Sequence, residues 1–182
     1  MTTQEILRAA QGAKLPLALA DADTKNAALE AMAGALIAAQ DKILDANKQD
    51  VENARGRVSD VMLDRLALTP GRLTDMAKGM REVAALPDPV GAVLRKIVRP
   101  NGLLIEKNAV PMGVIAIIYE SRPNVTSDTA ALAIKSGNAC ILRCGKEAWR
   151  SANAIVTTLR QGLRAAGLPE TAVCLIEDTT HA

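Results

Sequence analysis

The sequence predicts an α/β protein in which a parallel sheet follows an all-helical segment and a β-hairpin. Three observations support this fold class. Apolar residues recur at helical spacing as far as residue 85, an Asn-Gly pair separates two strand-like segments near residue 101, and three apolar runs alternate with helical stretches beyond residue 113. Apolar residues make up 49% of the 182 residues and charged residues 23%, which excludes a disordered chain.

Residues 1–86 are predicted to be helical, because apolar residues such as Leu29, Met32 and Leu36 fall on one helix face. A short polar side chain ahead of an apolar run can cap a helix. Such signals predict helix starts at Asp23-Thr24, Ser59 and Thr69-Pro70. The two prolines of residues 86–91 then end the helical pattern.

Residues 90–110 are predicted to form a hairpin, with strands at 93–98 and 103–106 joined through Arg99-Pro100-Asn101-Gly102. Asn-Gly favours a tight turn because both residues tolerate a positive φ angle. We expect this hairpin to be a sheet edge or a contact between copies of the chain.

Residues 111–182 are predicted to form a βαβ core. The apolar runs at 114–118, 139–142 and 172–176 indicate strands, and the helix between the last two ends at Gly167-Leu168-Pro169. Strands that alternate with helices pair in parallel through right-handed crossovers. Three strands alone leave a bare edge, so we expect the architecture to be incomplete.

Composition excludes several classes of protein. A net charge of +2 and 1% aromatic residues argue against a nucleic-acid partner. No apolar run approaches the roughly 20 residues that span a bilayer. The cysteines Cys140, Cys144 and Cys174 lack CxxC spacing and are odd in number, so neither a disulfide framework nor a zinc site follows. Reduced thiols fit a cytoplasmic protein.

Ligands of open parallel sheets bind beyond the carboxyl ends of the strands, which points to the loops 119–126, 143–149 and 177–179. In the second loop two cations, a glycine and a helix start suit a phosphate. It is not a P-loop, because Cys140 and Glu147 replace the required glycine and hydroxyl residue, and the chain has no GxGxxG motif. A solvated basic turn is the alternative interpretation.

The loop 119–126 is also polar. Its Arg122 side chain could hold a carboxylate or phosphate, and the Asn124 amide could donate to an oxyanion. Two plainer alternatives remain: Asn124 caps the following helix, and Glu120 forms a salt bridge with Arg122 instead of serving as an acid or base.

A nucleophile would have to be a cysteine, because the single histidine, His181, cannot complete a Ser-His-Asp set. Cys144 lies between Arg143 and Lys146 at a helix start, which predicts a lowered pKa. The alternative is that Cys144 is a bystander. Cys140 and Cys174 lie within apolar runs and are predicted to be core residues.

A resemblance to a known family rests on five stretches: Val-Ile-Ala-Ile-Ile-Tyr-Glu-Ser-Arg-Pro-Asn-Val-Thr at 114–126, Lys-Ser-Gly-Asn-Ala at 135–139, Ile-Leu-Arg at 141–143, Ala-Gly-Leu-Pro at 166–169 and Leu-Ile-Glu-Asp-Thr at 175–179. The chain resembles, essentially over its whole length, the gamma-glutamyl phosphate reductase family of the aldehyde dehydrogenase superfamily. The resemblance implies a Rossmann-like sheet of the aldehyde dehydrogenase type and NADPH-dependent reduction of L-glutamate 5-phosphate to L-glutamate 5-semialdehyde, with release of phosphate, in proline biosynthesis. It also implies a homo-oligomer.

The resemblance assigns roles to the loop residues. The nicotinamide and the reacting acyl group would border Tyr119, Glu120, Ser121 and Arg122, with Asn124 as the oxyanion donor. The adenosine ribose and its 2′-phosphate would lie against Arg143, Cys144, Gly145, Lys146 and Glu147. Where the family usually has glycine and serine this chain has Cys144 and Lys146, and we expect the extra cation to favour NADPH over NADH.

In that family the catalytic cysteine lies in a second domain downstream, and none of the three cysteines here matches it. We therefore expect residues 1–182 to be the amino-terminal cofactor-binding domain without the catalytic domain, and to have no reductase activity alone. Two alternatives remain. One is a stand-alone nucleotide-binding or interaction module, and the other is a general aldehyde dehydrogenase relative, which the anion-binding Arg122 disfavours.

Overall fold

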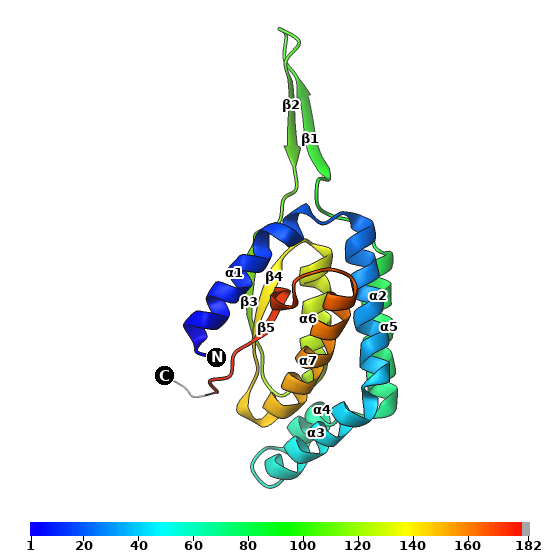
Figure 1. Ribbon diagram of the computed structural model, residues 1–182, viewed down its shortest axis with the longest axis vertical. Helices are drawn as coiled ribbons and strands as arrows, with labels where there is room; N and C mark the ends of the chain where they lie inside the picture. The colour runs from blue at the N-terminus through cyan, green and yellow to red at the C-terminus, as the bar shows by residue number, and fades with distance from the viewer. Residues whose placement is uncertain (180–182) are drawn as a thin grey trace.

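The computed structural model describes residues 1–179, and within them the predicted helical front, hairpin and parallel sheet all form (Figure 1). The helices of the front part are α1 (Thr3–Leu19), α2 (Ala22–Ala38), α3 (Gln40–Ala54), α4 (Asp60–Leu66) and α5 (Pro70–Ala85). Among these described residues no helix is both long and apolar enough to cross a membrane.

Two of the three predicted helix starts are confirmed. Ser59 caps α4 by accepting a hydrogen bond from the backbone of Met62, and Thr69 caps α5 ahead of a proline in the first turn. The start predicted at Asp23-Thr24 is wrong by two residues. Asp21 has an extended backbone and its Oδ1 accepts the N–H of Thr24 at 2.8 Å, whereas Asp23 already lies inside α2.

Helix α2 is central to the packing. Leu29, Met32 and Leu36 are fully buried, as their spacing predicts, and α2 packs against both α5 and α7 (Trp149–Ala165). The approach to α7 is so close that a Cβ atom on Gly162 would lie 2.6 Å from the Met32 backbone nitrogen. Glycine is therefore required at this contact between the two helix backbones.

The hairpin consists of β1 (Val93–Val98) and β2 (Leu104–Asn108), paired antiparallel, and it projects away from the body of the molecule (Figure 1). Gly102 has a φ angle of +83°, and its N–H donates to the Arg99 carbonyl at 2.9 Å. The predicted turn is confirmed. Every residue of β2 is exposed, so the hairpin rests on nothing within residues 1–179.

The parallel sheet has the strand order β3 (Val114–Ile118), β4 (Ala139–Arg143), β5 (Val173–Leu175). Helix α6 (Pro123–Lys135) connects the first pair and α7 the second, with short 3₁₀ turns η1 (Lys146–Ala148) and η2 (Glu170–Ala172). Side chains alternate across β4: Cys140 and Leu142 pack in the main core with α6 and α7, whereas Ile141 packs with Ile6 of α1. The central strand β4 is thus covered on both faces.

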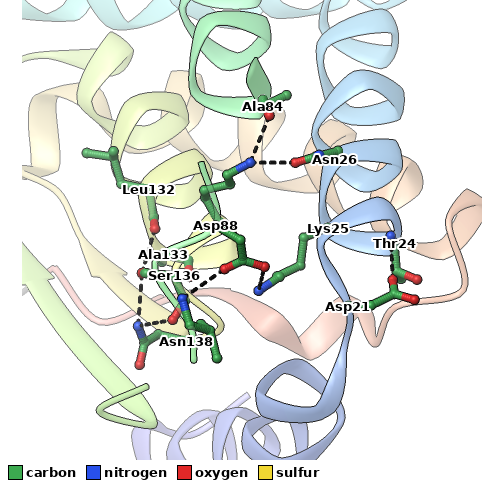
Figure 2. Close-up of polar contacts among 12 residues, drawn as sticks. Asp21, Thr24, Lys25, Asn26, Ala84, Asp88, Leu132, Ala133, Ser136 and Asn138 are labelled. Carbon is green, nitrogen blue, oxygen red and sulfur yellow. Dashed lines mark hydrogen bonds and ion pairs between the residues drawn. The ribbon is translucent and has the colours of Figure 1, made fainter. Parts of the chain in front are cut away.

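A buried group of charged and polar side chains joins α2, α5, α6 and the segment that leads into β1; we call it the Lys25–Asp88 cluster (Figure 2). Lys25 is fully buried and its Nζ lies 2.5 Å from Asp88 Oδ2. Lys135 Nζ donates to Asn26 Oδ1 at 2.6 Å and to the Ala84 carbonyl at 2.8 Å. Burial opposes ionisation of Asp88, but Lys25 and a backbone N–H outweigh it and lower the pKa of that carboxyl.

Candidate functional site

The loops that follow β3, β4 and β5 lie at one edge of the sheet, as expected for parallel strands. Ser121 Oγ donates to Glu147 Oε1 at 2.5 Å, which links the first loop to the second. Trp149 Nε1 donates to the Ile176 carbonyl at 3.3 Å, which links the second to the third. The three segments predicted to carry a site are therefore one contiguous surface.

The phenol of Tyr119 makes a hydrogen bond within the protein. Its hydroxyl lies 2.6 Å from Thr126 Oγ1 in α6, and burial raises the pKa of Tyr119 above its usual value of 10.0. The phenol therefore stays protonated near neutral pH and does not act as a base. The Tyr119 backbone N–H donates to the Arg143 carbonyl at 3.0 Å, which extends the pairing of β3 with β4 and fixes the start of the loop.

The next residues differ in exposure. Ser121 is buried while Glu120 and Arg122 are exposed. The suggested salt bridge between Glu120 and Arg122 does not form within residues 1–179; only their backbones bond, with the Arg122 N–H donating to the Glu120 carbonyl at 2.8 Å. Both charged side chains thus remain directed to the solvent side of the loop.

The suggestion that Asn124 caps α6 is wrong. Arg122 occupies the capping position without a side-chain bond, and Asn124 lies inside the first turn. Its Nδ2 donates to Asp128 Oδ2 at 3.1 Å, one helical turn on. An amide group carries two N–H donors, so the second one remains for a ligand. Burial raises the pKa of the Asp128 carboxyl against these hydrogen bonds. The i,i+4 spacing of Asn124 and Asp128 was the sequence signal for this pair.

A cleft of about 380 Å³ opens beside this loop. Residues of α4, α5 and α6 line it: Asp64, Arg65, Ala67, Leu68, Arg72, Asp75, Met76, Arg122, Asn124 and Asp128. A second hollow of about 240 Å³ shares Arg65 and Arg122 and adds Met62, Tyr119, Glu120, Ser121 and Val125. Sequence reasoning missed the contribution of α4 and α5, because no local pattern brings them to this loop.

The two arginines contributed by α4 and α5 differ in what they contact. The Arg72 guanidinium donates to the Asp64 and Ala67 carbonyls and to the Asp64 carboxylate. The Arg65 side chain has no hydrogen bond or ion pair within the part of the chain that the structure describes, and the same holds for Arg122. Arg72 therefore holds the α4–α5 corner together, while Arg65 and Arg122 are available to a ligand.

Cys144 contradicts the prediction of a lowered thiol pKa. It is 6% exposed and packs in the main core, and burial raises its pKa to about 12, outweighing the cation Arg143. Burial likewise raises the pKa of Cys140 to about 12 and that of Cys174 above its usual value. The burial of Cys144 favours the alternative that this residue is a bystander, because a buried, protonated thiol is a poor nucleophile.

In the remainder of the β4 loop, the Glu147 carboxylate folds back over Gly145. A Cβ atom at Gly145 would lie 2.5 Å from Glu147 Oε1, so glycine leaves room for this arrangement. Lys146 is exposed and lines a cleft of about 490 Å³ together with Arg57 and Arg150. These cations form a surface suited to a phosphate.

Asp50 of α3 is a further residue that sequence reasoning missed. Its Oδ2 accepts from both the backbone N–H and the hydroxyl of Ser151 at 2.7 Å each, although the two residues are 101 positions apart. Asp50 thereby caps α7, whose own preceding residue Ala148 provides no cap. The start of α7 and the loop before it are fixed by α3. His181 lies outside the described residues.

No family model matches the chain. Among solved structures, a probable aldehyde dehydrogenase from Listeria monocytogenes EGD-e has the same fold, with a TM-score of 0.71 at 19% identity over 97% of this chain and 36% of that one. The helical front, the hairpin and the parallel sheet are therefore those of the aldehyde dehydrogenase type.

Two solved structures with higher sequence identity lie within this aldehyde dehydrogenase-type fold. Gamma-glutamyl phosphate reductase from Thermotoga maritima has a TM-score of 0.94 and 43% identity, covering 97% of this chain and 43% of that one. The enzyme of the same name from Saccharomyces cerevisiae has a TM-score of 0.91 and 33% identity, covering 99% and 47%. In sequence, gamma-glutamyl phosphate reductase of Streptococcus pneumoniae (strain Hungary19A-6) is 51% identical over 181 residues, which are 100% of this chain and 43% of that protein.

The resemblance predicted from the sequence is confirmed: this chain is homologous over its whole length to gamma-glutamyl phosphate reductase. It spans less than half the length of these relatives, at 43% to 47% of each.

Proposed function

We propose that the protein carrying these residues reduces L-glutamate 5-phosphate to L-glutamate 5-semialdehyde with release of phosphate, as a step of proline biosynthesis. The observation that carries the proposal is the 51% identity over the whole chain to an enzyme of that name. The polar loop after β3 supports it, because an exposed Arg122 and a free amide N–H of Asn124 suit a phosphorylated acyl group.

We further propose NADPH as the cofactor. The cations Lys146 and Arg57, at the cleft of about 490 Å³, fit the additional 2′-phosphate that distinguishes NADPH from NADH. Gly145 and the folded Glu147 side chain would lie against the adjoining ribose, and Arg143 and Cys144 would support this loop from beneath. When bound, NADPH supplies the hydride that reduces the acyl group.

On the substrate side, Asn124 would donate its second N–H to the oxyanion that develops on the acyl carbon. Asp128 acts on the substrate only through Asn124, because it accepts the first N–H and so orients the amide. Glu120, Ser121 and Tyr119 would form the wall between substrate and nicotinamide. The buried, neutral thiols of this chain do not supply a nucleophile. We therefore propose that residues 1–182 form the cofactor-binding domain and are inactive alone.

We also propose that copies of the full-length protein associate through the hairpin, in the cytoplasm. Its strands expose apolar side chains that a contact would cover, with exposed fractions of 54% for Val93, 62% for Leu94 and 69% for Val98. The three cysteines are free, which agrees with a reducing compartment.

The test is a turnover assay on the protein purified from its own gene, with the 182-residue chain beside it. We expect freshly prepared L-glutamate 5-phosphate to drive loss of NADPH absorbance with the first and not with the second. Simple unphosphorylated aldehydes should be poor substrates in the oxidative direction. Turnover of plain aldehydes without phosphate would assign a general aldehyde dehydrogenase, and nucleotide binding without any turnover would assign a binding module.

A further inference from the structure

We propose that Arg65 of α4 and Arg122 together bind the phosphate of the acyl phosphate, first as the leaving group and then as the free product. This inference rests on the function proposed above and assigns a residue that no motif of the sequence indicates. Arg65 and Arg122 line both the cleft of about 380 Å³ and the adjoining hollow of about 240 Å³.

The first argument is availability. Neither guanidinium has a hydrogen bond or ion pair within residues 1–179, whereas the neighbouring Arg72 is held by Asp64 and by the Ala67 carbonyl. A planar guanidinium presents paired N–H donors that match two phosphate oxygens. Two guanidinium groups without side-chain partners among the described residues thus line the same hollow.

The second argument is charge. The hollow of about 240 Å³ contains one carboxylate, Glu120, and the two cations Arg65 and Arg122. With Arg122 alone, Glu120 would cancel the positive charge and the hollow would not favour an anion. Arg65 makes this hollow net positive. The cleft of about 380 Å³ also contains the carboxylates Asp64, Asp75 and Asp128, so the charge favours a phosphate in the hollow of about 240 Å³.

The third argument is that Arg65 is held in place by the fold. Helix α4 ends against Asn47 of α3, whose Nδ2 donates to the Leu66 carbonyl at 2.8 Å and whose Oδ1 accepts the Leu68 N–H at 2.7 Å. Leu66 itself is fully buried. The backbone that carries Arg65 is thus fixed relative to α3, although the Arg65 side chain is exposed.

The substrate has a phosphate and an α-carboxylate, and the position of Arg122 favours the phosphate. Arg122 precedes Asn124, the candidate oxyanion donor, by two residues, so an anion held there lies beside the reacting carbon. The phosphate is bonded to that carbon through oxygen, while the α-carboxylate is at the far end of the substrate.

In the proposed step a thiolate forms a C–S bond at the acyl carbon and the C–O bond to the phosphate breaks. The electron pair leaves on the phosphate oxygen, which then takes a proton from solvent. The two guanidinium groups stabilise the negative charge that builds on the leaving phosphate.

The decisive experiment measures the reaction in reverse, where phosphate is a substrate alongside the semialdehyde and NADP⁺. We expect Arg65→Gln to raise the KM for phosphate about tenfold and to leave the KM values for semialdehyde and NADP⁺ within about twofold. The matched control is Arg8→Gln, which removes another exposed arginine on α1 without a partner in the described chain. Its three KM values should match those of the unchanged protein.

Each alternative outcome has a distinct meaning. A rise in the KM for semialdehyde with an unchanged KM for phosphate would assign Arg65 to the α-carboxylate and overturn the proposal. No change in either KM would also overturn it. If the protein does not turn over L-glutamate 5-phosphate at all, the proposed function fails separately. The arginine pair is then tested by titrating inorganic phosphate into the 182-residue chain while following arginine Nε–H signals by NMR. Shifts at Arg65 and Arg122 that Arg65→Gln abolishes support the phosphate site, and their absence refutes it.

Discussion

The end of the α/β body near the hairpin and the end near α4 (Figure 1) differ in how their charged side chains are placed, and Figure 2 shows the first of these ends. Near the hairpin, Lys25 is fully buried and paired with Asp88, and its charge holds elements of the fold together. Near α4, Arg65 and Arg122 are exposed and have no partner among the described residues. Charge at the buried end thus holds the fold together, whereas we propose that the exposed guanidinium groups of Arg65 and Arg122 bind a ligand, because both line one hollow.

The largest expected effect is on stability and comes from the buried end. Lys25→Ala leaves the Asp88 carboxylate without its cation, and we expect a loss of about 3–5 kcal/mol in the free energy of unfolding. Urea unfolding followed by circular dichroism measures it. Lys78→Ala, which breaks an exposed i,i+4 pair with Glu82, is the control and should cost less than about 0.5 kcal/mol. Equal losses of stability in Lys25→Ala and Lys78→Ala would show that the buried ion pair contributes no more than an exposed one.

At the exposed end the expected effect is on rate instead of stability. Asn124→Ala should lower kcat about 100-fold, or about 2.7 kcal/mol, because the oxyanion loses a donor. Asp128→Ala should lower kcat less, about tenfold, because the amide remains but is no longer oriented. Steady-state kinetics of L-glutamate 5-phosphate reduction, in the enzyme of the proposed function, measure both. A larger loss in Asp128→Ala than in Asn124→Ala would show that the carboxylate itself takes part.

Smaller effects on stability and cofactor binding are expected where the loop after β3 meets the loop after β4. Ser121→Ala removes the hydrogen bond to Glu147, and we expect a loss of about 1 kcal/mol in stability and a rise of about threefold in the KM for NADPH. Glu147→Gln keeps an oxygen that can accept from Ser121, so its effect should be weaker. If both variants leave cofactor binding unchanged, the link between the loops has no role in binding.

The same ion pair has a pH dependence that tests its contribution to stability separately. The pKa of Asp88 is lowered from 3.8 in the folded protein, so its contribution to stability is fully present above pH 3.8 and is lost as pH falls through the folded pKa. Urea unfolding from neutral pH into acid should show Asp88→Asn to be less stable at neutral pH, with the two stability curves converging in acid. Parallel curves would show that the Lys25–Asp88 pair does not depend on ionisation.

Local patterns predicted most of the fold. The helix predicted to end at Gly167 is Trp149–Ala165, and the strand predicted over 139–142 is Ala139–Arg143, because apolar periodicity and glycine stops are encoded within each element. Asp50 and Arg65 could not be predicted in the same way. Asp50 meets Ser151 only after α3 packs on α7, and Arg65 reaches the β3 loop only through the fold.

Cys144 shows where local reasoning about charge went wrong. Neighbouring cations suggested a lowered pKa, but side chains alternate along β4 and just beyond it, so Cys144 lies on the same core-facing side as Cys140 and Leu142. Desolvation then dominates over the cation at Arg143. The burial of alternate residues was readable in the sequence, and it was the stronger signal.

The contact between Gly162 and Met32 has a mechanical consequence. Two helices of 17 residues each, about 25 Å long, touch backbone to backbone at this point. Neither helix can slide or rotate against the other without a clash, so α2 and α7 move as one rigid pair. This pair carries Lys25 near the start of α2, and the loop ahead of α7 leads directly into it. Any movement that widens the clefts must therefore come from the loops or from α4 and α5, and not from a change in the spacing of α2 and α7.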